Sequence, residues 1–189
     1  EESFSKDKNI FTYNVGLGRE NTTSKLFLSP ANEGASASLL KPSGHLKYHP
    51  EIIFEDTENI EICLYDDFDL NNVNFLNIDI QGYELEALKG SENSLKKYID
   101  YICIEISREE MYEDAILKNQ LDTYLKDFEF IRVSTRWASS KIPWGDAFYI
   151  KKTKVNTYKK IFSVINKFFE GFKFYYLFID PYRKFNSWK

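Results

Sequence analysis

The sequence has few of the residues that build disulfide frameworks or metal sites. It contains two cysteines and two histidines among 189 residues. Cys63 and Cys103 both lie in apolar, strand-like runs, so we expect small core residues in a reducing compartment. His45 and His49 have no nearby cysteine, and a solvated loop is the simpler interpretation of both, with a general base as the alternative. We therefore expect no metal site.

The sequence also lacks a long apolar run and a glycine-rich loop. No stretch approaches the roughly 20 apolar residues that span a bilayer, and the acidic start EESFSKDKN does not resemble a signal peptide, so we expect a cytoplasmic protein. Nothing of the form Asp-x-Gly-x-x-Gly is present. The lone Gly16-Leu17-Gly18 predicts a turn rather than a phosphate-binding loop, because no third glycine follows.

The most informative segment that is present runs from Val73 to Gly90, VNFLNIDIQGYELEALKG. Its apolar run has the length and continuity of a parallel strand covered on both faces. Asp79 lies one residue before the run ends, Gln81-Gly82 supplies a turn, and one helix of about four turns is expected over 84–98. In open α/β sheets the ligand binds beyond the carboxyl ends of the strands, so Asp79 is a candidate for chemistry.

A second strand of the buried type follows at Tyr101 to Ser107, with Glu105 near its end. The intervening helix makes this a strand-helix-strand unit, which places Asp79 and Glu105 at the same edge of adjacent parallel strands. The alternative for either acid is a helix cap or a pair with a surface base.

The flanking segments extend this pattern on both sides. We expect further strands over 10–18, 25–29 and 60–65, a loop over 33–49, an amphipathic helix over 109–126, and an antiparallel hairpin. The hairpin arms are 128–136 and 146–152. The expected fold is α/β, with a sheet that ends in an antiparallel hairpin and an added tail.

That tail differs in charge from the rest of the chain. Residues 151–189 hold ten Lys and Arg against two acids, whereas the first 150 hold 15 basic and 27 acidic residues. Twelve of the 32 aromatic residues also lie in the tail. We predict a helical tail over 153–189 that docks on the acidic domain 1–152 of its own chain or of a homo-oligomer partner, with contact to an anionic membrane surface as the competing use.

The segment Phe75 to Gly90 resembles the signature of FkbM-type methyltransferases. The serine-rich 35–40, the strand 102–107 and the closing 144–150 are similar to that family in order and spacing, so the resemblance covers roughly residues 10–152. It implies a Rossmann-like class I methyltransferase sheet, S-adenosylmethionine as the methyl donor, and methylation of a hydroxyl group on a small molecule such as a sugar, with no nucleic acid partner.

The resemblance also implies roles for particular residues. Asp79 would be the base or the group that orients the acceptor, with Glu105 and His45 behind it, while Gly16, Leu17 and Asp79 would lie along the donor. The donor-binding loop and the acid of the family's second strand have no counterpart here, so the chain is expected to be a carboxyl-terminal part of the domain or a degenerate relative. On that basis we expect this chain to bind the donor weakly or not at all by itself, and a version extended at the amino terminus to bind it.

Two other classes of protein remain open from the residues alone. A metal-dependent nuclease could use Asp79 and Glu105 as ligands, but Ser107 occupies the place where such enzymes carry a catalytic lysine. A non-catalytic binding domain that acts through its basic aromatic tail is the other alternative.

Overall fold

A computed structural model describes residues 10–54, 56–157 and 159. The chain divides into two compact units, Glu1–Lys151 and Lys152–Lys189. Only a 3-10 turn, η3 (Lys152–Lys154), and a few adjoining residues of the second unit are described. The predicted helical tail over 153–189 therefore lies almost wholly outside the described residues.

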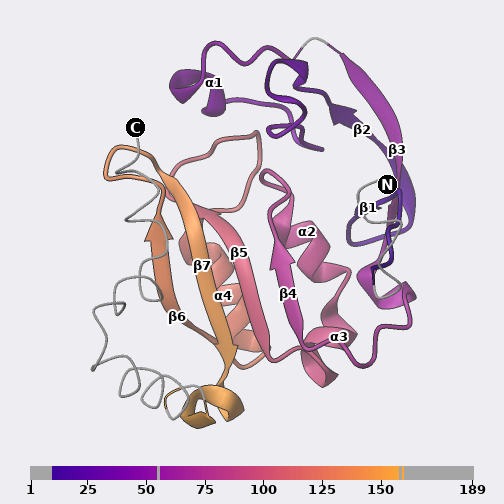
Figure 1. The fold of residues 1–189 in the computed structure, drawn as a ribbon, viewed down its shortest axis with the longest axis vertical. Helices are drawn as coiled ribbons and strands as arrows, with labels where there is room; N and C mark the ends of the chain where they lie inside the picture. The colour runs from indigo at the N-terminus through magenta and orange to yellow at the C-terminus, as the bar shows by residue number, and fades with distance from the viewer. Residues whose placement is uncertain (1–9, 55, 158, 160–189) are drawn as a thin grey trace. The chain divides into compact units, whose positions relative to one another are not determined.

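The first unit is a mixed α/β structure with a four-stranded and a three-stranded sheet (Figure 1). The larger sheet has the order β4-β5-β7-β6. Its strands are β4 (Phe75–Ile78), β5 (Tyr101–Ser107), β6 (Phe130–Trp137) and β7 (Trp144–Lys151). β4 and β5 are parallel, whereas β7 is antiparallel to both β5 and β6. The parallel pair and the terminal hairpin predicted from the sequence are thus confirmed.

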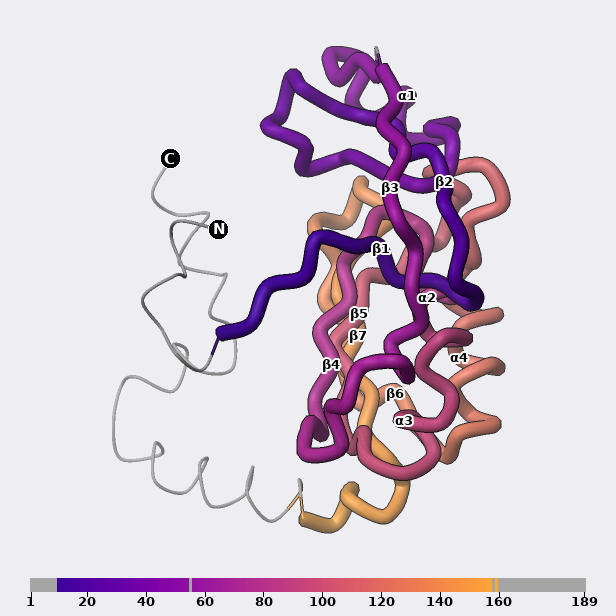
Figure 2. The backbone as a smooth tube through the Cα atoms, turned by 90° about the vertical axis from the view of Figure 1, so that its right-hand side faces the viewer, coloured from indigo at the N-terminus to yellow at the C-terminus, as the bar shows by residue number. Residues whose placement is uncertain are grey.

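Three helices lie on one side of this sheet, as Figure 2 shows. They are α2 (Glu84–Lys89), α3 (Glu92–Lys97) and α4 (Lys118–Asp127). The main cluster of buried apolar side chains includes Ile78, Ile104 and Leu125. The prediction that the first strand is covered on both faces is wrong for the described residues, because burial alternates along β4 and Phe75 is 47% exposed.

The helix predicted over 84–98 is broken into α2 and α3. Gly90 stands at the break, and a Cβ atom there would lie 1.9 Å from the carbonyl oxygen of Gly18. A new helix, α3, begins after the break, and the side chain of Asp66 caps its amino terminus. The carboxylate of Asp66 accepts hydrogen bonds from the backbone N–H of Asn93 at 2.7 Å and of Ser94 at 2.9 Å. The close approach of two chain segments thus explains why the helix does not continue.

The helix predicted over 109–126 begins only at Lys118. The residues before it are irregular because their backbone pairs elsewhere: the N–H groups of Ser43 and His45 both donate to the carbonyl of Met111, and the N–H of Glu113 donates to the carbonyl of Lys41. Long-range backbone pairing therefore replaces the first two turns of the expected helix.

The smaller sheet has the order β1-β3-β2. Its strands are β1 (Gly16–Leu17), β2 (Thr22–Phe27) and β3 (Thr57–Cys63), so the strand expected over 10–18 is reduced to two residues. Three short helical segments flank it: η1 (Pro30–Asn32), α1 (His45–Tyr48) and η2 (Tyr65–Asp67). No helix among the described residues is long and apolar enough to cross a membrane.

Candidate functional site

The two acids predicted from the sequence lie together at the carboxyl ends of β4 and β5. The side-chain amide of Gln81 links them, since its Nε2 donates to Oδ1 of Asp79 at 2.8 Å and lies 3.5 Å from Oε2 of Glu105. β4 and β5 run in parallel register, with Ile78 opposite Ile104. The register therefore explains why residues 26 positions apart in the chain share one sheet edge.

A tight turn after β4 holds this edge in place. Gln81 and Gly82 have φ values of 55° and 97°, which lie in the left-handed region. Glu84 closes the turn, because its Oε1 accepts hydrogen bonds from the N–H of Ile80 at 3.2 Å and of Gly82 at 3.0 Å. Glu84 is buried, and burial raises the pKa of its carboxyl group. The second acid of the signature is thus a structural brace of the turn.

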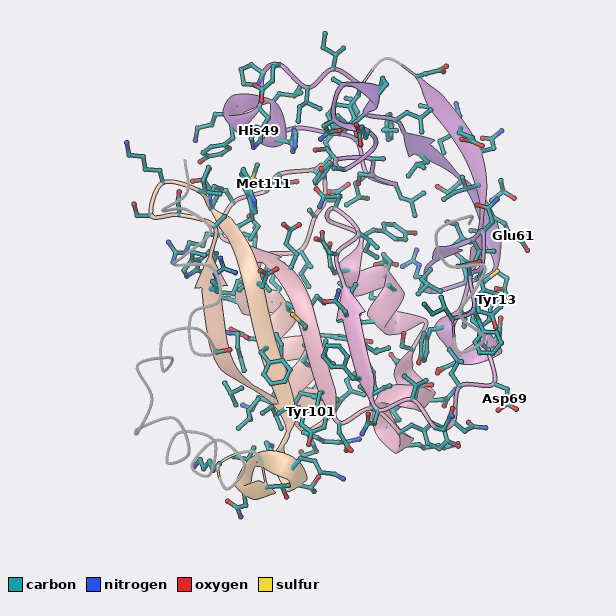
Figure 3. All side chains as sticks on the ribbon, in the orientation of Figure 1. Tyr13, His49, Glu61, Asp69, Tyr101 and Met111 are labelled. Carbon is teal, nitrogen blue, oxygen red and sulfur yellow. The ribbon has the colours of Figure 1, made fainter. Side chains whose placement is uncertain are left out.

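A cavity of about 250 Å³ lies beside the strand ends. Figure 3 shows His49 and Met111, two of its lining residues, at the opposite end of the molecule from Tyr101, where β5 begins. The lining combines hydrogen-bonding and aromatic side chains with apolar ones, and it includes Asn32, Ser36, His45, His49, Gln81, Glu105, Ser107, Met111, Tyr112, Ile116, Lys118 and Trp144.

We call residues 30–52 and 108–117, which line the cavity on its other sides, the cap. A polar network joins the cap to the strand ends. The hydroxyl group of Tyr112 lies 2.9 Å from Oε1 of Gln81 and 3.1 Å from the carbonyl oxygen of Ser36. The hydroxyl oxygen of Ser36 in turn lies 3.1 Å from Nε2 of His45 and accepts a hydrogen bond from Nδ2 of Asn32 at 2.8 Å.

His45 is only 6% exposed, so the interpretation of a solvated loop histidine is wrong for this residue. Its ring packs near the rings of His49, Phe54 and Tyr112. Burial first, and then the neighbouring His49, lower the pKa of the imidazole below its usual value. His45 is therefore a neutral hydrogen-bonding group at physiological pH.

The carboxyl group of Glu105 is strongly perturbed by its surroundings. Burial, followed by the charges of Asp79, Glu84 and Asp146, raises the pKa of its carboxyl group to about 8. Asp146 lies directly opposite Glu105 in the β5-β7 register, and burial together with Asp79 raises its pKa as well. At neutral pH Glu105 is thus mainly a protonated acid that can donate a hydrogen bond.

The residues predicted to lie along a donor are in the smaller sheet. Gly16 packs against Ile62, where a Cβ atom would lie 2.7 Å from that side chain, and Leu17 contacts the main apolar cluster. Neither residue lines the cavity beside Asp79 or a second cavity of about 240 Å³ that Arg19 and Tyr83 line. A role for Gly16 and Leu17 in donor binding stays a prediction.

Sequence reasoning missed the cap residues Ser36 and Tyr112, as well as Trp144, because tertiary pairing alone brings them to the cavity. Cys63 and Cys103 are free and partly buried. Within residues 10–54, 56–157 and 159, no group of three or more His, Cys, Asp or Glu side chains is arranged to hold a metal ion.

Comparison with known proteins identifies the family of this chain. A family model described as the methyltransferase FkbM domain matches residues 2–133, which is more than half of the chain. The matched region includes β4, β5, the turn at Gln81 and both parts of the cap. No curated protein and no solved structure matches the chain.

Proposed function

Because the chain belongs to the FkbM methyltransferase family, we propose that it transfers the methyl group of S-adenosylmethionine to a hydroxyl group of a small molecule such as a sugar. The observation that supports this proposal best is the pairing of Asp79 and Glu105 through Gln81 beside a cavity of about 250 Å³. A cavity of this kind, with a few convergent polar groups and a perturbed acid, is typical of small-molecule sites.

The charge at the strand ends suits a cationic methyl donor. Asp79 and Asp146 are exposed carboxyl groups close enough to interact electrostatically, and opposite charge nearby favours the ionised form of each. Asp79 would hold the positive end of the donor, and the family resemblance adds Gly16 and Leu17 as further contacts. When bound, S-adenosylmethionine supplies an already activated methyl group, so the protein must chiefly align the acceptor and remove its proton.

The lining of the cavity suits a neutral acceptor that is rich in hydroxyl groups. Its hydrogen-bonding side chains include Asn32, Ser36 and Gln81, and Trp144 offers an aromatic surface. Lys118, a cationic lining residue, lies 3.7 Å from the carboxylate of Asp122. The cation of Lys118 is thus paired already, and an anionic acceptor would lie near the acids of the strand ends. We therefore favour a sugar or another polyol over a phosphorylated compound.

Asp79 is the proposed proton acceptor. Its carboxylate lies at the solvent-exposed end of β4, so a proton taken from the acceptor hydroxyl can pass on to water. Glu105, which is protonated at neutral pH, donates a hydrogen bond instead of accepting the proton. His45 contributes a neutral imidazole on the cap side of the cavity. Two carboxyl groups with different environments thereby take different roles.

The proposal is tested by incubating the full chain with methyl-labelled S-adenosylmethionine and a panel of sugars and polyols, and identifying the products by mass spectrometry. We expect a methyl ether on a hydroxyl group. Asp79→Asn should lower the turnover rate by about 10²- to 10⁴-fold, because a positioned proton acceptor is lost.

Asp69→Asn is the matched control. Asp69 is an exposed acid that lies far from the strand ends in Figure 3, and its substitution should leave turnover unchanged. Methyl esters or methylated amines as the products, or an Asp79→Asn variant with normal turnover, would contradict the proposal.

A further inference from the structure

Gln81 lies where four segments of the chain meet. Its side-chain amide contacts Asp79 after β4 and Glu105 in β5. Its amide oxygen accepts a hydrogen bond from Tyr112 of the cap, and its backbone carbonyl accepts one from the hydroxyl of Ser38 at 2.6 Å. No other residue among those that the structure describes hydrogen-bonds to both acids and, through its side chain or backbone, to both parts of the cap.

The hydrogen bonds fix which way the amide of Gln81 faces. The carboxylate of Asp79 can only accept, so the end of the amide that lies 2.8 Å from it is Nε2, and the end that faces Tyr112 is Oε1. Burial raises the pKa of the Tyr112 phenol, so it keeps its single proton, which is shared between Oε1 of Gln81 and the carbonyl oxygen of Ser36. With Oε1 turned to Tyr112, the Nε2 group necessarily faces the two carboxyl groups as a donor. The Asp79 carboxylate thus sets the direction of the amide, Tyr112 supports it at the oxygen end, and the amide presents its N–H bonds to the acids.

The backbone at Gln81 adopts a conformation that does not favour glutamine. Its φ of 55° lies in a region that glycine and asparagine adopt more readily than glutamine, and such strain persists where surrounding contacts stabilise it. A glycine would make the turn with less strain. What glutamine adds is an amide that reaches across the strand ends.

We propose that Gln81, whose amide is held between Asp79 and Tyr112, is the positioning residue of the strand-end site, and that this amide holds the Asp79 carboxylate and the Glu105 carboxyl group in their separate roles. The roles themselves rest on the proposed methyl transfer, whereas the contact with the acids does not. A donor amide between two acids partly offsets the repulsion that would otherwise act between them.

The groups that face Glu105 determine what a substitution of Gln81 will do. Asp79 follows β4, Glu84 projects from α2, and Asp146 lies opposite on β7. Tyr112 of the cap also interacts with Glu105, and Arg136 on β6 lies opposite Asp146 and partly offsets its charge. Every carboxyl neighbour disfavours ionisation of Glu105. Gln81→Glu would place one more carboxylate in this group and remove the N–H donor.

The test is a pH titration of the Glu105 carboxyl group, followed by carbon NMR in the full chain and assigned with the Glu105→Gln variant. In Gln81→Glu we expect the titration midpoint of Glu105 to rise by on the order of one pH unit, because a like charge is added nearby. Gln120→Glu is the matched control, since the same chemical change is made at an exposed residue of α4. An unchanged midpoint in Gln81→Glu would overturn the proposal.

Two further variants keep the test decisive if Gln81→Glu does not fold. Gln81→Asn tolerates the left-handed backbone but shortens the side chain by one methylene group, and Tyr112→Phe removes the hydrogen bond that holds the amide at its oxygen end. Both should raise the midpoint of Glu105 by less than Gln81→Glu does. Midpoints at the wild-type value in both variants would show that Gln81 is merely a structural turn residue.

A second measurement links the contact to the reaction. Gln81→Asn should lower kcat for methyl transfer and move its pH profile with the Glu105 midpoint, with a smaller effect on the KM for the acceptor. The carboxyl titration needs neither donor nor acceptor. A wild-type chain without methyl transfer would therefore refute the proposed function, while the titration would still decide whether Gln81 sets the state of the acids.

Discussion

The two sheets of the first unit differ in how they are held together. In the four-stranded sheet, alternate residues of β5 are buried against the helices, and Ile102 and Ile104 are 0% and 1% exposed. In the three-stranded sheet, Ile62 is the only described strand residue that is buried. The larger sheet therefore rests on apolar packing, whereas the smaller one rests mainly on its backbone ladder.

The candidate site lies where these two kinds of structure meet. Asp79 and Glu105 come from the packed sheet, while Ser36 and His45 come from the cap, which continues from the smaller sheet. Such a division suits a transferase, because the reacting groups need a fixed position and the side that admits the acceptor needs less rigidity.

The largest expected effect of this difference is on stability. Leu125 on α4 is 0% exposed, and Leu125→Ala should lower the free energy of unfolding by about 2–5 kcal/mol, because a cavity is left in the packed core. Leu26 in β2 is partly buried, and Leu26→Ala should cost about 1 kcal/mol or less, since it loses less apolar area. Denaturant unfolding measures both. Equal losses would show that the two sheets are packed alike.

A smaller effect should depend on pH. The pKa of Glu105 is about 8 in the folded chain, against an ordinary value of 4.5. Between these values the unfolded chain has released this proton, whereas the folded chain keeps it. The contribution of Glu105 to the free energy of unfolding therefore falls as pH rises from 4.5 to 8, and it stays constant above pH 8. Glu105→Gln removes this loss. The difference in free energy of unfolding between the variant and the wild type should therefore be larger at pH 9 than at pH 5, in favour of the variant, by on the order of 2–4 kcal/mol.

Thermal or denaturant unfolding at both pH values checks this expectation. Glu51→Gln is a suitable control, because Glu51 is an exposed acid at the far end of the cap segment and its pKa is lowered by its own backbone N–H and by His49. A Glu105→Gln variant with the same pH dependence as the wild type would show that Glu105 ionises normally.

The smallest effect is expected on the surface of the cap. Lys41 and Glu113 form an ion pair at 2.8 Å with both side chains more than half exposed. Glu113→Gln should change the free energy of unfolding by no more than about 1 kcal/mol, and less at high salt. A double-mutant cycle with Lys41→Met measures the pair. A coupling several times larger would mean that charge, rather than backbone pairing, joins the two parts of the cap.

The sequence predicts where Asp79 and Glu105 lie in the fold, whereas their roles stay a prediction. Asp79, Glu105 and the turn between them follow from local patterns, because the apolar period and the Gln-Gly turn are encoded within one short segment. The break at Gly90 and the late start of α4 at Lys118 could not be found this way. Each depends on a contact between segments far apart in the chain. Burial of His45 has the same origin, because distant residues enclose it.

The most direct test of the central claim is to locate the donor on the chain. We would titrate the full chain with S-adenosylmethionine and follow the backbone amide signals by NMR, which detects weak as well as tight binding. The account predicts that the largest shifts occur at Asp79, Gln81 and Glu105, with little change in the paired strands β6 and β7 away from Asp146. Shifts confined to other parts of the chain, or none at saturating donor, would contradict a methyl-transfer site at the ends of β4 and β5.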